Sequence, residues 1–106
     1  MVNLLKTIFG NNNKVKMENI LKEGAFLVDV RSPGEFAEGH VKGSTNIPLD
    51  QIQQQLGQFK GKESIVVFCR SGARSAQAKS ILEQNGFADV TNGGTWESVN
   101  RMVQNR

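Results

Sequence analysis

The segment Ser64–Phe68 reads Ser-Ile-Val-Val-Phe and leads directly into Cys69, the only cysteine of the chain. A short apolar run rich in β-branched residues is typical of a strand buried on both faces of a parallel sheet. A turn of small residues follows, and residues 74–85 are predicted to form a helix that Gly86 ends. Since parallel strands are usually joined through a helix, this strand–turn–helix unit indicates an α/β fold.

The rest of the chain repeats this alternation of strand-like and helix-like segments. Further strands are predicted over residues 14–16, 26–30, 44–46 and 88–91. Further helices are predicted over residues 17–22 and 95–104, from Ser32-Pro33 onward, and from an Asp50 N-cap to residue 56. The pattern predicts a mostly parallel sheet with helices on both faces. Ligands of such folds bind at the carboxyl ends of the strands, where Val30-Arg31, Cys69 and Asn92-Gly93-Gly94 are expected to meet.

Length and charge narrow the class of protein. A chain of 106 residues is long enough for one domain with one core. The formal net charge is +3, and no basic run interleaved with aromatic residues indicates nucleic-acid binding. A lone cysteine and a lone histidine cannot supply a standard metal-ligand set, so neither a metal nor another cofactor is expected.

The first thirteen residues are expected to be an N-terminal extension, with the domain spanning residues 14–106. Leu4, Leu5, Ile8 and Phe9 would share one face of a short packing helix. The apolar run is broken by polar residues and is far shorter than the roughly 20 residues that cross a bilayer, so no membrane association is predicted. A single cysteine forms no internal disulfide, and a cytoplasmic location is expected.

The surroundings of Cys69 distinguish it from an inert core cysteine, which is the commoner role for a lone thiol. Successive main-chain N–H groups in a small-residue turn form a concave anion-binding nest, and the start of a helix adds partial positive charge. A helix N-terminus alone contributes up to about 2 kcal/mol, so the turn amides, with Arg70 and Arg74, would also be needed to make the thiolate dominant.

The loop Cys69-Arg70-Ser71-Gly72-Ala73-Arg74-Ser75 resembles the active-site loop of rhodanese-type sulfurtransferases. Three further segments match that family in order, namely residues 27–31 (Leu-Val-Asp-Val-Arg), residues 35–48 (from Glu35 to Pro48) and residues 92–96 (Asn-Gly-Gly-Thr-Trp). On this basis the chain is identified as a single-domain rhodanese-like sulfurtransferase. The resemblance implies a three-layer α/β fold with a central, mostly parallel, five-stranded sheet.

The resemblance also implies a mechanism with few groups. The Cys69 thiolate would take sulfane sulfur from thiosulfate or a persulfide, become a persulfide itself, and pass the sulfur to cyanide or a thiol. The main-chain amides of the loop would stabilise the sulfur anion, while Arg70 and Arg74 would orient an anionic donor. The expected substrate-binding residues are Arg70, Ser71, Gly72, Ala73, Arg74 and Ser75. A thioredoxin-like or cysteine-desulfurase-like protein is a further candidate partner.

Several residues near the expected site are expected to have structural rather than chemical roles. His40 is expected to support a turn rather than to act as a base. Asp29 and Arg31 are expected to pair near the rim of the sheet, and Glu35 is another candidate partner for an arginine. Trp96 and the turn Gly93-Gly94 are expected to form part of the pocket wall.

Two other functions remain open at this stage. Cysteine phosphatases and arsenate reductases have an arginine six positions after the cysteine, whereas here Ser75 occupies that position and Arg74 comes one residue earlier. The second alternative is a regulatory module or a sulfur carrier without turnover of its own.

Overall fold

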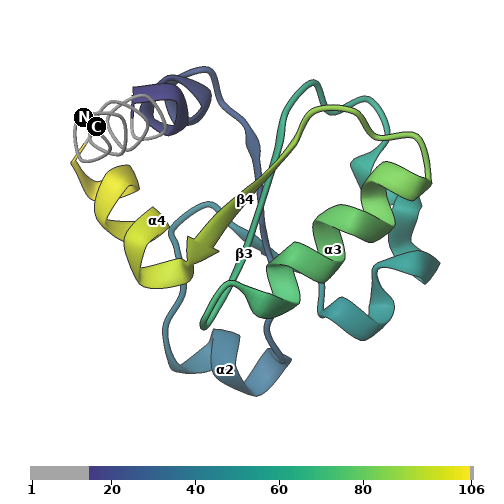
Figure 1. Cartoon of the computed structure of the whole chain (residues 1–106). Coiled ribbons are helices and arrows are strands. Elements are labelled where there is room, and N and C mark those ends of the chain that lie inside the picture. The colour runs from purple at the N-terminus through teal and green to yellow at the C-terminus, as the bar shows by residue number, and fades with distance from the viewer. Residues whose placement is uncertain (1–14, 106) are drawn as a thin grey trace, which may run out of the picture.

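A computed structural model describes residues 15–105, and the expected N-terminal extension lies outside these residues. Within them, a parallel sheet has the strand order β2-β1-β3-β4. Its strands are β1 (Phe26–Asp29), β2 (Thr45–Asn46), β3 (Ile65–Cys69) and β4 (Val90–Thr95). Figure 1 shows helix α3 (Ala73–Gln84) on one side of the sheet, with α4 (Trp96–Gln104) and a helical segment over residues 15–22 on the other. Helix α2 (Pro33–Glu38) lies near the end of the sheet where β3 finishes.

Strand β3 contributes side chains to the hydrophobic core on both faces of the sheet, as its apolar sequence predicts. All five of its side chains are buried, and they alternate between two clusters because successive side chains of a strand point to opposite faces. Ile65, Val67 and Cys69 belong to the cluster that includes Ala78 and Leu82 of α3. The other cluster combines Val66 and Phe68 of β3 with Val99 of α4 and with Ile20 and Leu21. The Cys69 side chain therefore points toward α3.

The predicted opening of α2 at Ser32-Pro33 is confirmed. The Ser32 hydroxyl accepts a hydrogen bond from the Glu35 N–H, and the Glu35 carboxylate accepts one from the Ser32 N–H, which together form a capping box. Pro33 occupies the first turn, where its missing N–H costs no helical hydrogen bond. This local chemistry fixes Glu35 at the start of α2.

Two predicted elements are wrong. The expected strand over residues 14–16 is not present, because residues 15 and 16 belong to the helical segment 15–22, and the sheet of the described residues has four strands rather than five. The helix expected from an Asp50 N-cap is instead a pair of 3₁₀ helices, η1 (Leu49–Gln51) and η2 (Gln53–Phe59). Pro48 precedes η1 and no side chain caps it, so Asp50 lies inside the first turn rather than before it.

The last strand extends further than its composition predicts. The prediction ended it at residue 91 and assigned Gly93-Gly94 to a turn, whereas β4 continues to Thr95. It does so through an irregularity in its pairing with β3, in which Val67 pairs with Asn92 and Phe68 with Gly94, so that Gly93 is an extra residue. A Cβ atom on Gly93 would lie 2.9 Å from Val99 Cγ2. Glycine therefore allows β4 to pack closely against α4 at the bulge.

Within residues 15–105, none of the helices has the length and apolar character required to cross a lipid bilayer.

Candidate active site

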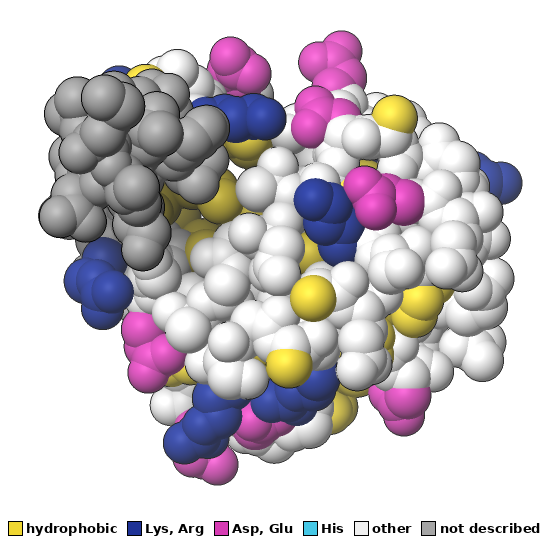
Figure 2. Space-filling model, viewed as in Figure 1, with side chains coloured by type: hydrophobic (Ala, Val, Ile, Leu, Met, Phe, Trp, Pro, Cys, Tyr) yellow, Lys and Arg dark blue, Asp and Glu magenta, His cyan; other side chains and the backbone are white. Residues whose placement is uncertain are grey.

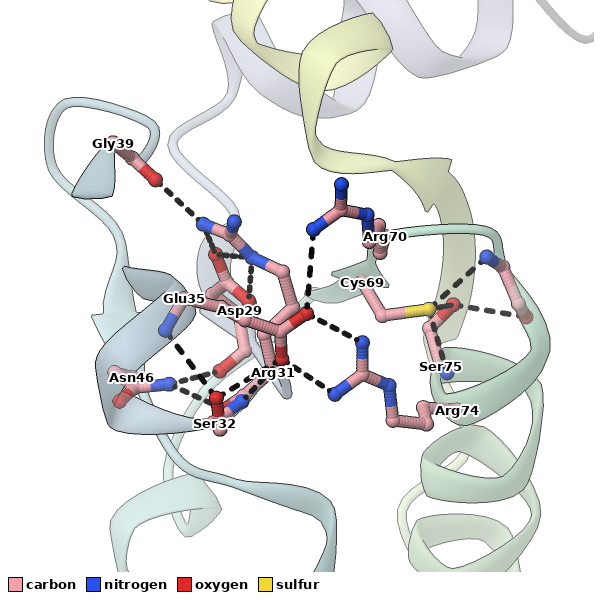
Figure 3. Close-up of polar contacts among 11 residues, drawn as sticks. Asp29, Arg31, Ser32, Glu35, Gly39, Asn46, Cys69, Arg70, Arg74 and Ser75 are labelled. Carbon is pink, nitrogen blue, oxygen red and sulfur yellow. Dashed lines mark hydrogen bonds and ion pairs between the residues drawn. The ribbon is translucent and has the colours of Figure 1, made fainter. Parts of the chain in front are cut away.

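Cys69 ends β3, and its sulfur lies within the loop that leads into α3 (Figure 3). The Sγ atom accepts a hydrogen bond from the Gly72 N–H at 3.0 Å and a longer one from the Ser75 N–H at 3.4 Å. Gly72 has a φ of +96°, in the left-handed region that favours glycine. This conformation turns the chain so that the loop amides face the sulfur, and the Cys69 side chain has no exposed surface.

A side-chain network continues from the sulfur to β4. The Ser75 hydroxyl lies 3.4 Å from Cys69 Sγ and 2.7 Å from Asn92 Oδ1. Asn92 Oδ1 also accepts the Gly94 N–H at 2.9 Å, and its Nδ2 group donates to the Gly72 carbonyl at 3.3 Å. The bulge in β4 thus brings Asn92 against the same loop that surrounds the thiol.

These contacts set the ionisation of the thiol. Burial raises the pKa of Cys69, because it disfavours the charged form. Hydrogen bonds from the Ser75 hydroxyl and from the N–H groups of Ser75, Gly72 and Ser71 act in the opposite direction and outweigh burial. The net result is a pKa below the usual value for a cysteine, which favours the nucleophilic thiolate.

The two loop arginines have an acidic partner. Arg74 forms a bidentate ion pair with Glu35, at 2.7 Å from Nη1 to Oε1 and 3.0 Å from Nη2 to Oε2. Arg70 Nη1 lies 3.9 Å from Glu35 Oε2, and the Arg70 side chain is 74% exposed. Hydrogen bonds from Arg74, together with those from the Ser32 N–H and hydroxyl, lower the pKa of Glu35 to about 2, so this carboxylate is ionised at neutral pH.

A second ion pair, which the sequence predicts, lies at the end of the neighbouring strand β1. Arg31 Nη2 and Asp29 Oδ2 are 2.7 Å apart, and both side chains are almost completely buried. Arg31 also donates to the Gly39 carbonyl at 2.7 Å, and its guanidinium lies over the Trp96 ring. The pair therefore ties the end of β1 to the chain after α2 and to the start of α4, which supports the rim of the site.

His40 has the structural role expected of it. Its ring stacks on Phe36, with centroids 3.8 Å apart, and its Nδ1 atom lies 2.8 Å from the Phe36 carbonyl oxygen. The side chain is exposed and its contacts are local.

The structure gathers the predicted site residues into one loop but gives them different positions. The N–H groups of Gly72 and Ser75 donate to the sulfur and that of Ser71 also acts on it, whereas Arg70, Ser71 and Ala73 are exposed. The sequence interpretation assigned no role to the Asn92 side chain, and the signal available for it was only its place before two glycines at a strand end. Among residues 15–105, histidine, cysteine, aspartate and glutamate form no cluster of three or more that could hold a metal ion.

Comparisons with known proteins identify the family of the chain. The rhodanese-like domain family matches residues 13–95. The chain is 35% identical over 74 residues to the thiosulfate sulfurtransferase PspE of Escherichia coli, with 68% of this chain and 71% of that protein covered. It is also 37% identical over 68 residues to the uncharacterized protein YqhL of Bacillus subtilis, covering 64% of this chain but only about half (54%) of YqhL.

A solved structure shares the fold as well. A rhodanese with anions from E. coli superposes with a TM-score of 0.65 at 31% identity, and the match covers 71% of this chain and 91% of that one. The chain thus has a strand-end cysteine, a loop that surrounds it and a parallel sheet beneath them. It belongs to the rhodanese-like domain family.

Proposed function

We propose that this protein is a sulfurtransferase that moves sulfane sulfur from thiosulfate or a persulfide to a thiophilic acceptor through a persulfide on Cys69. The observation that carries the proposal is the convergence of the Gly72 and Ser75 N–H groups and the Ser75 hydroxyl on Cys69 Sγ. These donors lower the pKa of the thiol despite its burial. Similarity to PspE, which is named a thiosulfate sulfurtransferase, supports the same reaction class.

The reaction has two balanced steps. In the first, the Cys69 thiolate attacks the outer sulfur of thiosulfate, the S–S bond breaks, and sulfite leaves with the bonding electron pair. In the second, cyanide attacks the terminal sulfur of the Cys69 persulfide, which yields thiocyanate and regenerates the thiolate. Neither step requires proton transfer from a general base, because the nucleophile is already ionised.

The loop would hold the negative charge throughout this cycle. The terminal sulfur of the persulfide is an anion like the thiolate, and the N–H groups of Ser71, Gly72 and Ser75 would stabilise it as well. Because Cys69 has no exposed surface, the donor would reach the sulfur only when the surrounding protein opens.

The direct test is the mass of the protein after treatment with thiosulfate. We expect wild-type protein to gain the mass of one sulfur atom and to turn over thiosulfate and cyanide, whereas Cys69→Ser should do neither while remaining folded. The variant Cys69→Ser/Ser80→Cys is a matched control, since it moves the single thiol to an exposed position on α3. It should alkylate readily but form no persulfide with thiosulfate.

Other outcomes would assign other functions. Persulfide formation without turnover would indicate a sulfur carrier that hands its sulfur to a protein partner. Rapid hydrolysis of a small aryl phosphate, lost in Cys69→Ser, would indicate a cysteine phosphatase and contradict the proposal. Absence of both a persulfide and turnover in the wild-type protein would exclude sulfur transfer from these donors.

A further inference from the structure

One carboxylate engages both arginines of the Cys69 loop. Glu35 forms two hydrogen bonds to Arg74, at 2.7 and 3.0 Å, and lies 3.9 Å from Arg70. Figure 3 shows the two guanidinium groups reaching toward Glu35, while the Cys69 sulfur points toward Ser75. Arg74, expected to receive an anionic donor, is therefore already paired with an anion of the protein itself, and the same carboxylate lies near the exposed Arg70.

The charges beside the thiol consequently almost cancel. Arg70 and Arg74 together carry +2 and Glu35 carries −1, which leaves +1, and the Cys69 thiolate would reduce this to zero. Figure 2 shows basic and acidic side chains mixed at the lower edge of the molecule, where Figure 1 places α2. A dianion such as thiosulfate would meet little net attraction there, because it must compete with Glu35 for Arg74.

We infer that Glu35 is a specificity-determining residue, a competing internal anion that weakens the binding of dianionic sulfur donors relative to donors without a charged tail. The inference rests on the proposed function and deepens it, because it assigns the favoured donor class to persulfides of thiols. The Cys69 thiolate attacks the outer sulfur of such a donor, the donor S–S bond breaks, and the donor thiol leaves as a thiolate with the bonding electron pair. This donor has no SO3 group for a guanidinium group to hold. Thiosulfate remains a substrate of lower affinity.

The substitution Glu35→Gln tests this cleanly. Glutamine can still accept the Ser32 N–H in a capping box, so the start of α2 is retained while the competing charge is removed. Glu38→Gln is the matched control, because Glu38 is an exposed carboxylate on the same helix and forms no ion pair within the described residues. A second variant, Glu35→Ala, removes the same charge and guards against an effect peculiar to the glutamine amide.

The size of the effect follows from Coulomb's law. A carboxylate about 6 Å from a bound dianion in a water-like dielectric weakens binding by about a factor of ten. We expect Glu35→Gln and Glu35→Ala to lower KM for thiosulfate about tenfold at low ionic strength, with kcat changed less than twofold. The difference from wild type should shrink as salt is added. With the persulfide of a neutral thiol as donor, KM should stay within twofold of wild type.

A purely structural ion pair would behave in the opposite way. If Glu35 served only to position Arg74, its removal would leave the arginine misplaced and would raise KM for thiosulfate. An increase or no change in KM for thiosulfate in the two Glu35 variants, or an equal decrease in Glu38→Gln, would overturn the inference.

Calorimetric titration with sodium sulfate separates this inference from the proposed function. Sulfate is a dianion that carries no transferable sulfur, so its binding is independent of turnover. Suppose that Glu35→Gln binds sulfate more tightly than wild type, but that neither protein transfers sulfur. This result would support the role of Glu35 as a competing anion and would refute the proposed sulfurtransferase function. Normal sulfur transfer by wild type, with sulfate affinity equal in wild type and Glu35→Gln, would refute the role of Glu35 alone.

Discussion

Replacing Ser75 by alanine should reduce the thiolate content of Cys69 without moving the loop. The Ser75 side chain is completely buried, and its hydroxyl lies 3.4 Å from Cys69 Sγ. Alanine keeps the Ser75 main-chain N–H that also reaches the sulfur and removes the hydroxyl with its contacts to the sulfur, to Asn92 Oδ1 and to the Gly72 carbonyl. Since this hydrogen bond lowers the pKa of Cys69, its loss should raise that pKa.

The size of the effect follows from the geometry of the hydroxyl group. Hydrogen bonds to charged groups contribute about 1.5–3 kcal/mol. The contact with sulfur is long, and Asn92 Oδ1 at 2.7 Å and the Gly72 carbonyl at 3.1 Å compete for the single hydroxyl proton, so the lower end of this range applies. About 1.4 kcal/mol corresponds to a tenfold smaller thiolate fraction at any pH well below the pKa.

Ultraviolet absorbance of the thiolate, recorded across a pH series, measures this fraction directly and does not depend on access to the buried sulfur. Cys69→Ser provides the blank, and Ser80→Ala is the matched control on the exposed face of the same helix. We expect the titration of Ser75→Ala to move to higher pH while that of Ser80→Ala overlays the wild type. Superimposable curves for wild type and Ser75→Ala, with both proteins folded, would refute the role assigned to the hydroxyl.

Two further predictions concern stability. Because the pKa of Glu35 falls from 4.5 to about 2 on folding, its ionised form stabilises the folded protein above pH 4.5, and this contribution disappears as pH falls toward 2. Urea unfolding should show wild type up to about 1 kcal/mol more stable than Glu35→Gln at neutral pH, with the gap closing in acid; a gap independent of pH would contradict this. Gly93→Ala should cost about 1–3 kcal/mol because the new Cβ would lie 2.9 Å from Val99 Cγ2 and 3.1 Å from Val66 Cγ1. Gly34→Ala, which meets open space in α2, should cost nothing, and equal losses for the two glycines would refute the steric argument.

The sequence predicts best the parts of the fold that short-range chemistry controls. The apolar run that becomes β3 and the Ser32-Pro33 opening of α2 each act within a few residues. The expected partnership of Glu35 with an arginine is also confirmed, although Arg74 is 39 residues away. The pairing of Asp29 with Arg31 needs only two residues of strand end, and its prediction is confirmed as well.

The errors arise where partners distant in sequence decide the outcome. Glycines at 93 and 94 indicate a turn in isolation, but pairing with β3 draws them into β4 as a bulge. That bulge places Asn92 beside Ser75, a contact that no local pattern encodes. The segment after Pro48 has helical composition, yet it forms two short 3₁₀ helices with a non-helical residue, Gln55, inside the second.

The complete burial of Cys69 would affect its oxidation as well as the proposed sulfur transfer. A peroxide molecule, like a sulfur donor, would reach the thiolate only when the surrounding protein opens. If the protein transfers sulfur as proposed, the same opening would limit both the lifetime of the reduced thiol in an oxidising medium and the rate of turnover. A substitution that eases this opening would then raise the rate of sulfur transfer and the rate of irreversible oxidation to sulfinic acid together.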